Sequence, residues 1–339
     1  GIMGAGSIGC FVGGCLEAER AAAVTFVGRP SLAGPIAAHG LTLRGFGREQ
    51  HLAPAEVQFE TEVGALEASQ VVLCCVKSGA TAAAAKALAE VLRPEAVVVS
   101  LQNGIRNAEI LRRHLPRQRV VSAVVGFNVV IHEGAVFQQT TTGPLVVEAE
   151  EGSRDDPWIA ALRSAGLQVE LAKPIAPEQW TKLVVNLNNA ISALSGAPTP
   201  AMLLSPKYRR AMTLLLDEAL AVLHAAGIET AKFRGVPLRL MSRILKLPTL
   251  IVRLVLRAQL EVDPESRASM YQDLERGRKT EVDLLNGEIV RLAAACGVEA
   301  PLNRRIVARV HEAEEAGKGS PRLDADALLA SLLSGGPFG

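Results

Sequence analysis

The chain has 339 residues, a length that accommodates two domains, and 49% of its residues are hydrophobic while 21% are charged. The formal net charge of +1 gives no overall positive field, so we expect no nucleic-acid partner. No apolar run approaches the roughly 20 residues that span a bilayer and no signal peptide is recognisable, so we predict a cytoplasmic protein without a membrane partner. The cysteines form no C-x-x-C pair and the histidines show no metal-ligand spacing, so reduced thiols and no metal site are expected.

The chain opens with a glycine-rich loop that is typical of dinucleotide binding. The segment G-I-M-G-A-G-S-I-G fits the G-x-G-x-x-G pattern at Gly4, Gly6 and Gly9, and a helix over 8–18 and a strand over 23–27 are predicted to follow. In such a unit the first glycine makes the tight turn, the second lets the backbone approach the pyrophosphate, and the third allows close helix–strand packing. Only three residues precede the loop, so we expect the first strand to begin upstream. The predicted cofactor loop comprises Gly4, Ala5, Gly6, Ser7, Ile8 and Gly9.

The end of the second predicted strand indicates which nicotinamide cofactor is bound. An NAD-preferring enzyme places an acid there for the ribose 2′-hydroxyl, whereas this chain reads V-G-R-P-S. Arg29 can pair with a 2′-phosphate and Ser31 can add a hydroxyl donor. The sequence therefore predicts NADP (NADPH), with a solvated loop charge as the alternative interpretation of Arg29.

Polar residues follow two further buried strands. The apolar run 70–76 ends at Lys77, and the strand predicted over 97–101 is followed by Gln102, Asn103 and Gly104. Ligands of open α/β sheets bind at the carboxyl ends of strands, so we predict that Lys77 and Asn103 lie near the nicotinamide, although each could be an ordinary loop residue. We also predict a hairpin or added strand pair over 41–46 and 56–59, strands over 120–127, 129–138, 145–148 and 167–171, and helices over 80–92 and 157–165.

The second half of the chain carries helical periodicity throughout. We predict an α/β protein in which an N-terminal Rossmann-type doubly wound sheet, the NADP-binding domain at 1–173, is followed by an all-α C-terminal domain at 174–335 for substrate binding and dimerisation. A hinge is expected at 172–177, and its closure would complete the site. The predicted helices cover 176–196, 206–226, 237–247, 250–260, 280–296, 301–316 and 325–333.

The first of these helices carries three polar residues on one stripe. Lys182, Asn186 and Asn189 are four and seven positions apart, and the rest of the helix is largely apolar. A buried ammonium beside amides could hold a polarised carbonyl and a carboxylate, although a polar network that only fixes helix packing is the alternative.

A basic segment follows later in the same half. Seven Lys or Arg and no acids lie between Glu229 and Glu261. This segment could be a membrane-surface patch, but we favour a wall beside anionic ligands or a solvated outer face.

Several motifs together resemble the ketopantoate reductases (2-dehydropantoate 2-reductases). They are the opening glycine loop, V-K after the fourth core strand, L-Q-N-G at 101–104, W-T-K-L-V-V-N-L-N-N-A-I-S-A-L at 180–194, and S-M-Y-Q-D-L-E-R-G-R-K-T-E-V-D-L-L-N-G at 269–287. The similarity covers nearly the whole chain. It implies a Rossmann domain followed by a helical domain like the C-terminal domain of 6-phosphogluconate dehydrogenase.

The resemblance also implies roles for individual residues. Lys182 would be the catalytic lysine, and Asn103 would bind near both nicotinamide and substrate. Asn186 and Ser269 would contact substrate, and Glu281 would lie by the cofactor ribose or the catalytic lysine. Arg29 and Lys77 would hold the 2′-phosphate and the adenosine side. Two departures are Ala80, where the family often has glutamine, and Asn189, which lies seven rather than eight residues after the lysine.

The predicted activity is NADPH-dependent reduction of ketopantoate to pantoate, in pantothenate and coenzyme A biosynthesis. The partner would be a small 2-oxo acid, and the assembly a homodimer. Two alternatives stay open: reduction of another small 2-oxo acid, and a non-catalytic NADP-binding sensor.

Overall fold

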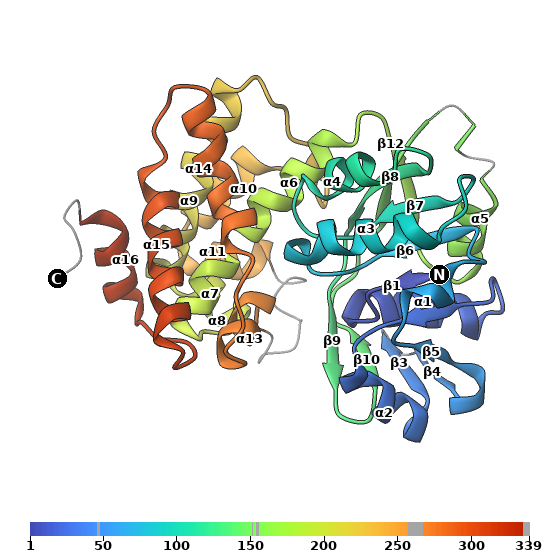
Figure 1. Cartoon of the computed structure of the whole chain (residues 1–339). Helices are drawn as coiled ribbons and strands as arrows, with labels where there is room; N and C mark the ends of the chain where they lie inside the picture. The colour runs from blue at the N-terminus through green and yellow to red at the C-terminus, as the bar shows by residue number, and fades with distance from the viewer. Residues whose placement is uncertain (46–47, 151, 154–155, 257–266, 335–339) are drawn as a thin grey trace. The chain divides into compact units, whose positions relative to one another are not determined.

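The computed structural model describes residues 1–45, 48–150, 152–153, 156–256 and 267–334. The chain divides into two compact units, Gly1–Gln179 and Trp180–Gly339 (Figure 1). The first contains the sheet and the second is mainly helical, so the predicted fold class is confirmed, with one short hairpin in the helical unit.

The first unit is built on a sheet that has eight strands in the described residues, in the order β12-β11-β8-β7-β6-β1-β2-β5. The pairings from β8 to β5 are all parallel, whereas β11 is antiparallel to β8. From β1 the chain first builds outward through β2 on one side, and it later returns to place β6 on the other side of β1. The position between β1 and β6 is therefore the switch point of a doubly wound sheet. The strands are β1 (Ile2–Met3), β2 (Thr25–Val27), β5 (Gln58–Glu60), β6 (Val71–Cys74), β7 (Val97–Ser100), β8 (Arg119–Val125), β11 (Leu145–Glu148) and β12 (Val169–Ala172).

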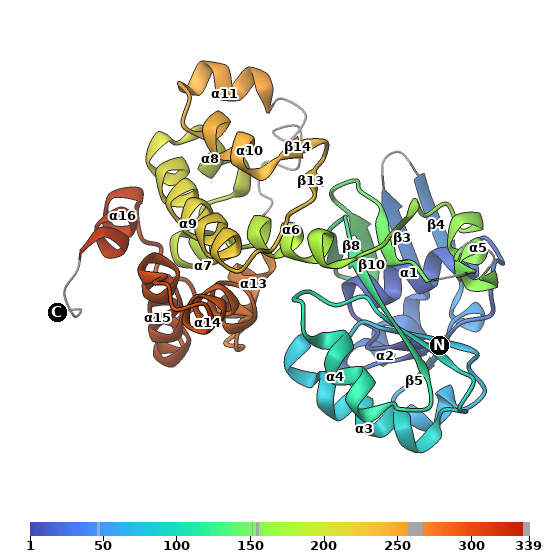
Figure 2. The same ribbon diagram turned by 90° about the horizontal axis from the view of Figure 1, so that it is seen from above.

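Side chains of the central strands alternate between two apolar cores. On β7, Val99 joins a core with α1, while Val98 faces a core with α3 and α4 on the opposite face (Figure 2). Such strands are buried on both faces, which explains why they read as continuous apolar runs. The helices of this unit are α1 (Ser7–Ala18), α2 (Pro30–His39), α3 (Thr81–Val91), α4 (Asn107–His114) and α5 (Pro157–Ser164), with 3₁₀ turns η1 (Pro54–Glu56), η2 (Val63–Leu66) and η3 (Ser78–Ala80).

A second sheet, in the order β4-β3-β10-β9, packs against α1. Its strands are β3 (Leu41–Gly45), β4 (Arg48–Leu52), β9 (Val129–His132) and β10 (Val136–Gln139). The predicted pairing of 41–46 with 56–59 is wrong, because β3 pairs with β4 and β5 instead extends the main sheet beside β2. The strand β4 was missed because its sequence, R-E-Q-H-L, is largely polar and exposed.

The strand predicted over 129–138 is also wrong in one respect. It is a hairpin, β9 and β10, that turns through Gly134 and Ala135, both with positive φ. Apolar residues on both sides of this turn made the two strands read as one.

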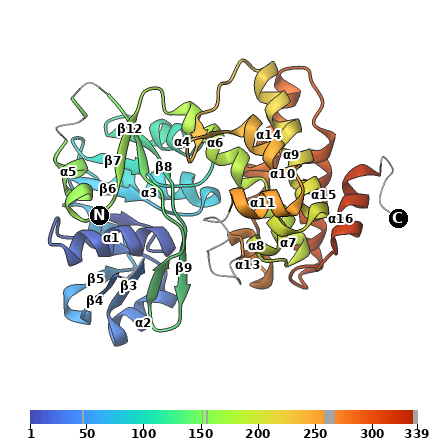
Figure 3. The ribbon, with the colours of Figure 1, turned by 180° about the vertical axis from the view of Figure 1, so that it is seen from behind.

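The second unit packs its helices around the long α9 (Figure 3). Its elements are α6 (Ala176–Asn186), which spans the division between the units, α7 (Asn189–Ser195), α8 (Thr199–Leu204), α9 (Pro206–Ala225), the hairpin β13–β14 (Lys232–Phe233 and Val236–Pro237), α10 (Leu238–Leu245), α11 (Thr249–Val255), α13 (Ser269–Glu275), η5 (Val282–Leu284), α14 (Asn286–Ala295), α15 (Pro301–Ala316) and α16 (Ala325–Leu333). The last part of the helix predicted over 250–260, residues 257–260, lies outside the described residues.

The single helix predicted over 176–196 is wrong. It breaks after Asn186, and α7 begins at Asn189. At the break the backbone N–H groups of Leu187 and Ala190 donate to carbonyls three residues earlier, instead of four as in an α-helix. The Asn188 side chain also donates to the carbonyl of Val185 at 3.4 Å. Asparagine side chains compete with the helix for backbone groups in this way, and the N-L-N-N sequence concentrates them.

The long helix predicted from Thr280 to Cys296 is shorter than expected. A 3₁₀ turn, η5, comes first, and α14 begins only at Asn286. Thr280 does not cap α14, because its backbone N–H and its hydroxyl both donate to Glu314 of α15.

Candidate active site

The glycine loop joins β1 to α1 in the conformation that its sequence predicts. Gly4 has φ +95°, and the N–H groups of Gly4 and Ala5 both donate to the Val27 carbonyl at 2.9 Å. A Cβ at Gly9 would lie 2.5 Å from the Gly4 carbonyl oxygen, so helix and loop pack too closely for a side chain. A Cβ at Gly6 would meet nothing within 4 Å. The loop is therefore tight where it packs and open beside Gly6.

Helix α1 begins immediately after this loop, at Ser7. The N–H groups of Ser7 and Ile8 belong to the first turn and have no acceptor within the helix. A helix start with free N–H groups beside an open glycine attracts anions such as a pyrophosphate.

The end of β2 lies against the same loop. A Cβ at Gly28 would come within 2.7 Å of the Ala5 Cβ, which shows how close the two segments are. Arg29 follows as an exposed residue, and its side chain has no hydrogen-bond or ion-pair partner among the described residues. Ser31, in the first turn of α2, is also exposed. Both side chains are available to a ligand at this strand end.

Lys77 and Asn103 follow β6 and β7, which are paired in parallel. Both residues are exposed, and their loops are linked because the Ser78 hydroxyl donates to the Asn103 carbonyl at 2.7 Å. The structure thus brings the two predicted strand-end residues to one edge of the sheet, next to the switch point. The buried polar residues that link the loops, Ser78 and Asn107 among them, were not identified from the sequence, because they look like ordinary loop residues.

In the second unit, Lys182 lies in the middle of α6 with a half-buried side chain. Desolvation, together with a smaller effect of the positive charge of Arg234, lowers the pKa of its amine from 10.5 to about 8. Arg234 is at the tip of the β13–β14 hairpin, which α6 holds through a 3.2 Å bond from the Thr181 hydroxyl to the Ala231 carbonyl. No particular role was predicted for Arg234, which has a positive φ of 50°.

The polar stripe predicted on one helix is divided by the break. Asn186 remains one turn from Lys182 at the end of α6, but Asn189 begins α7. The geometric argument that placed Asn189 beside Lys182 assumed a continuous helix, so it no longer holds.

Ser269 is the first residue of α13, which packs on α7. The preceding N–H, of Ala268, donates to the Ser192 hydroxyl at 3.4 Å, one turn along α7 from Asn189. Arg267 strengthens this attachment by donating to the Gly196 carbonyl at 2.9 Å. The exposed Ser269 is thereby held at the same helix that carries Asn189.

Glu281 lies in the turn that opens η5, and its side chain is half-buried. Its neighbour Thr280 is bonded to Glu314, so Glu281 is attached to the α15 side of the unit.

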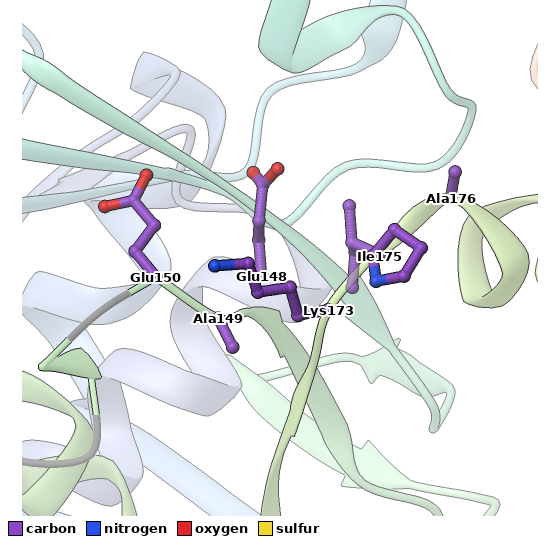
Figure 4. A pocket seen from close by; sticks show the side chains of 7 residues that line it. Glu148, Ala149, Glu150, Lys173, Ile175 and Ala176 are labelled. Atoms are coloured by element: carbon purple, nitrogen blue, oxygen red, sulfur yellow. The ribbon is translucent and has the colours of Figure 1, made fainter.

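A pocket of about 400 Å³ lies elsewhere on the first unit, lined by residues 148–150 and 173–176 (Figure 4). It opens where β11 and β12 end. Strands β8, β7 and β6 separate β11 from β1, which leads into the glycine loop. The pocket therefore lies on the far side of the sheet from that loop, and we exclude it as the dinucleotide site.

The basic segment of the second unit is largely solvated. Arg239, Arg243 and Arg253 are exposed on α10 and α11. They share this surface with exposed apolar side chains: Leu240, Leu247, Leu250, Ile251, Leu254 and Val255. No helix among those described is long and apolar enough to cross a lipid bilayer.

Two family descriptions match the chain, "Ketopantoate reductase PanE/ApbA" over residues 1–152 and "Ketopantoate reductase PanE/ApbA C terminal" over residues 174–314. A crystal structure of a PanE/ApbA family ketopantoate reductase from Ralstonia eutropha is 31% identical, covers 94% of this chain and 98% of its own, and superposes with a TM-score of 0.79. The chain belongs to the ketopantoate reductase family.

Curated members of the ketopantoate reductase family show the same full-length similarity. The 2-dehydropantoate 2-reductase of Archaeoglobus fulgidus is 29% identical over 92% of this chain and 97% of its own length. That of Halobacterium salinarum is 27% identical over 93% and 99%. The D-mandelate dehydrogenase solved with NADH and anilino(oxo)acetate, at 18% identity and a TM-score of 0.74 over 93% of this chain and 98% of its own, shares the fold.

Proposed function

We propose that the chain is an NADPH-dependent 2-dehydropantoate 2-reductase, which reduces ketopantoate to pantoate in the biosynthesis of pantothenate and coenzyme A. Full-length similarity to relatives that carry this name supports the proposal. The observation that carries it is the Lys182 amine, whose lowered pKa of about 8 suits a group that donates a proton near neutral pH.

The residues of the first unit fit a dinucleotide with a 2′-phosphate. The space beside Gly6 admits a pyrophosphate, and the first N–H groups of α1 would bind its oxygens. Arg29 and Ser31 would bind the 2′-phosphate, and Lys77 the adenosine side. When bound, NADPH supplies the hydride that reduces the keto carbon. Asn103 would contact both the nicotinamide and the substrate.

Lys182 acts on the substrate oxygen in this mechanism. Negative charge grows on the keto oxygen as the carbon is reduced, and the protonated amine stabilises that charge and donates its proton. Asn186, Asn189 and Ser269 would orient the carboxylate and hydroxyl of the substrate, so that its carbonyl stays within reach of Lys182. Glu281 would lie by the cofactor ribose, or would act as a counter-charge that keeps Lys182 protonated.

The test is oxidation of NADPH by the purified chain with ketopantoate, run beside NADH and a panel of other small 2-oxo acids. We expect ketopantoate to give the highest kcat/KM. A higher kcat/KM with another 2-oxo acid would reassign the substrate, and NADPH binding without turnover of any acid would indicate a sensor. Lys182→Ala should lose kcat far more than NADPH affinity, whereas equal losses would contradict the proton-donor role.

The cofactor preference is tested at Arg29. Arg29→Ala should weaken NADPH binding about tenfold and leave NADH binding unchanged, because only NADPH carries the 2′-phosphate. Arg20→Ala, which removes another exposed positive charge of the first unit, is the control. Equal weakening of both cofactors by Arg29→Ala would contradict the assignment.

We also propose a homodimer that forms through α10 and α11. A monomeric protein rarely exposes adjacent apolar side chains such as Leu250 and Leu254, which are 82% and 76% exposed. A structural neighbour from Staphylococcus aureus is described as a dimeric ketopantoate reductase. Light scattering should give twice the chain mass, and Leu250→Asp/Leu254→Asp should give the monomer; an unchanged mass in that variant would exclude this surface.

A further inference from the structure

The two loops that carry Lys77 and Asn103 are joined by buried polar side chains. Although Lys77 and Asn103 are themselves exposed, residues next to them are turned inward and at most 9% exposed. Buried polar groups of this kind cost free energy unless they are hydrogen-bonded. The inward-facing residues are Ser78, Thr81, Gln102 and Asn107.

Asn107, the first residue of α4, forms the centre of this network. Its amide nitrogen donates to the Asn103 carbonyl at 2.6 Å and to the Ser78 hydroxyl at 3.1 Å. Its amide oxygen accepts from the Thr81 hydroxyl at 2.7 Å. Both amide hydrogens and the carbonyl are therefore used, which fixes the orientation of the amide.

The Asn103 carbonyl is held from two sides. It accepts from Asn107 and also from the Ser78 hydroxyl, at 2.7 Å. Ser78 belongs to the loop after β6, whereas Asn103 and Asn107 belong to the loop after β7 and to α4. The position of the Asn103 backbone relative to Lys77 thus depends on these two donors.

A second set of bonds joins the same loops without contacting Asn103. Gln102 donates to the Val76 carbonyl at 2.9 Å and to the Thr81 hydroxyl at 2.7 Å. These bonds stabilise the loops. A variant that weakens them should lose stability while both donors to the Asn103 carbonyl remain.

We infer that Asn107 is a positioning residue for the reduction: it fixes the Asn103 backbone, and through it the Asn103 side chain, at the carboxyl edge of β7. The inference rests on the proposed function, because it takes Asn103 as a residue that contacts nicotinamide and substrate. Displacing such a contact by a fraction of an ångström lowers the rate of reaction while leaving the protein folded.

The test compares three single variants. Asn107→Ala removes one of the two donors to the Asn103 carbonyl and also the donor to the Ser78 hydroxyl, and Asn107→Asp keeps the size of the side chain but places an oxygen against the Asn103 carbonyl. Ser100→Ala is the matched control, because it removes a buried hydroxyl that donates to Gln102 and leaves Asn107 and both donors to the Asn103 carbonyl in place. Each variant is measured for melting temperature, kcat, KM and hydrogen exchange of the backbone amides in residues 101–106.

We expect both Asn107 variants to lose about tenfold or more in kcat and to exchange faster over residues 101–106. Ser100→Ala should lower the melting temperature by a similar amount and retain kcat within about twofold. In an Asn103→Ala background, Asn107→Ala should change kcat less than about twofold, because the side chain that it positions is already gone.

Three results would overturn the inference. They are a kcat in Asn107→Ala that matches Ser100→Ala, effects of Asn103→Ala and Asn107→Ala that simply multiply, and unchanged exchange over residues 101–106. Failure of the proposed function would look different, since the unaltered protein would then reduce no 2-oxo acid. Hydrogen exchange would still decide in that case whether Asn107 holds the loop.

Discussion

The pH dependence of the reaction tests the environment of Lys182 most directly. With a pKa of about 8, the amine is mostly protonated near pH 7, and only about a tenth of it remains protonated near pH 9. If the protonated amine is the proton donor, kcat/KM should fall roughly tenfold between about pH 7 and pH 9. A lysine with the ordinary pKa of 10.5 would stay almost fully protonated over this range.

Variants separate the two causes of the lowered pKa. Arg234→Ala removes the neighbouring positive charge, so the alkaline limb of the profile should move to higher pH, but desolvation should keep it below 10.5. Arg239→Ala removes an exposed charge that does not contribute to this shift, so its profile should match that of the unaltered protein. Lys182→Arg should lose most of kcat, because a guanidinium stays protonated and cannot donate the proton.

The assay is initial-rate NADPH oxidation with ketopantoate over this pH range, with saturating cofactor. A limb near pH 10 in the unaltered protein, or equal profiles for Arg234→Ala and Arg239→Ala, would refute the reasoning.

Stability gives an independent check on the same group. The folded pKa of Lys182 lies below the unfolded one, so between about pH 8 and 10.5 the unfolded chain binds more protons than the folded one. The contribution of Lys182 to the free energy of unfolding should therefore rise with pH across this window. The difference between the unaltered protein and Lys182→Met, measured by denaturant unfolding, should show that rise.

Two further predictions concern glycine packing and a buried arginine. Gly6→Ala should weaken NADPH binding and leave the melting temperature nearly unchanged. Gly9→Ala should lower the melting temperature, because its Cβ would lie 2.5 Å from the Gly4 carbonyl oxygen. Titration calorimetry measures the binding and thermal unfolding the melting temperature, and the opposite pattern would contradict the assigned roles. Arg209 is 3% exposed and donates to three backbone carbonyls, of residues 203, 245 and 247, so Arg209→Ala should cost about 3 kcal/mol of unfolding free energy, against under about 0.5 for the exposed Arg210→Ala. Equal losses in a denaturant titration would show that these bonds contribute little.

The sequence was most informative where one local rule determines the structure. The glycine loop, the buried strands and the helices begun by Pro206 and Pro301 were predicted closely, because turn geometry, burial on both faces and proline at a helix start act over a few residues. The fold class and the family followed from these elements and from the motifs around them.

The errors occurred where tertiary contacts outweigh local pattern. The 176–196 segment is apolar enough for one helix, yet side-chain competition at Asn188 and packing on both sides break it. Strand β4 is polar and owes its conformation to β3. Among site residues, Arg234 and Asn107 were not identified, because the first acts through a hairpin tip and the second through bonds to a loop that follows a different strand.

The pairing of β3 with β10 has a consequence for how the chain is made. Val136 aligns with Thr42, so one edge of β3 stays open on the ribosome until most of the first unit has been synthesised. An unpaired edge in a nascent chain is a template for association with other chains. Translation products that stop before β10 should consequently depend on chaperones and aggregate, while those that include Gln139 can close this small sheet.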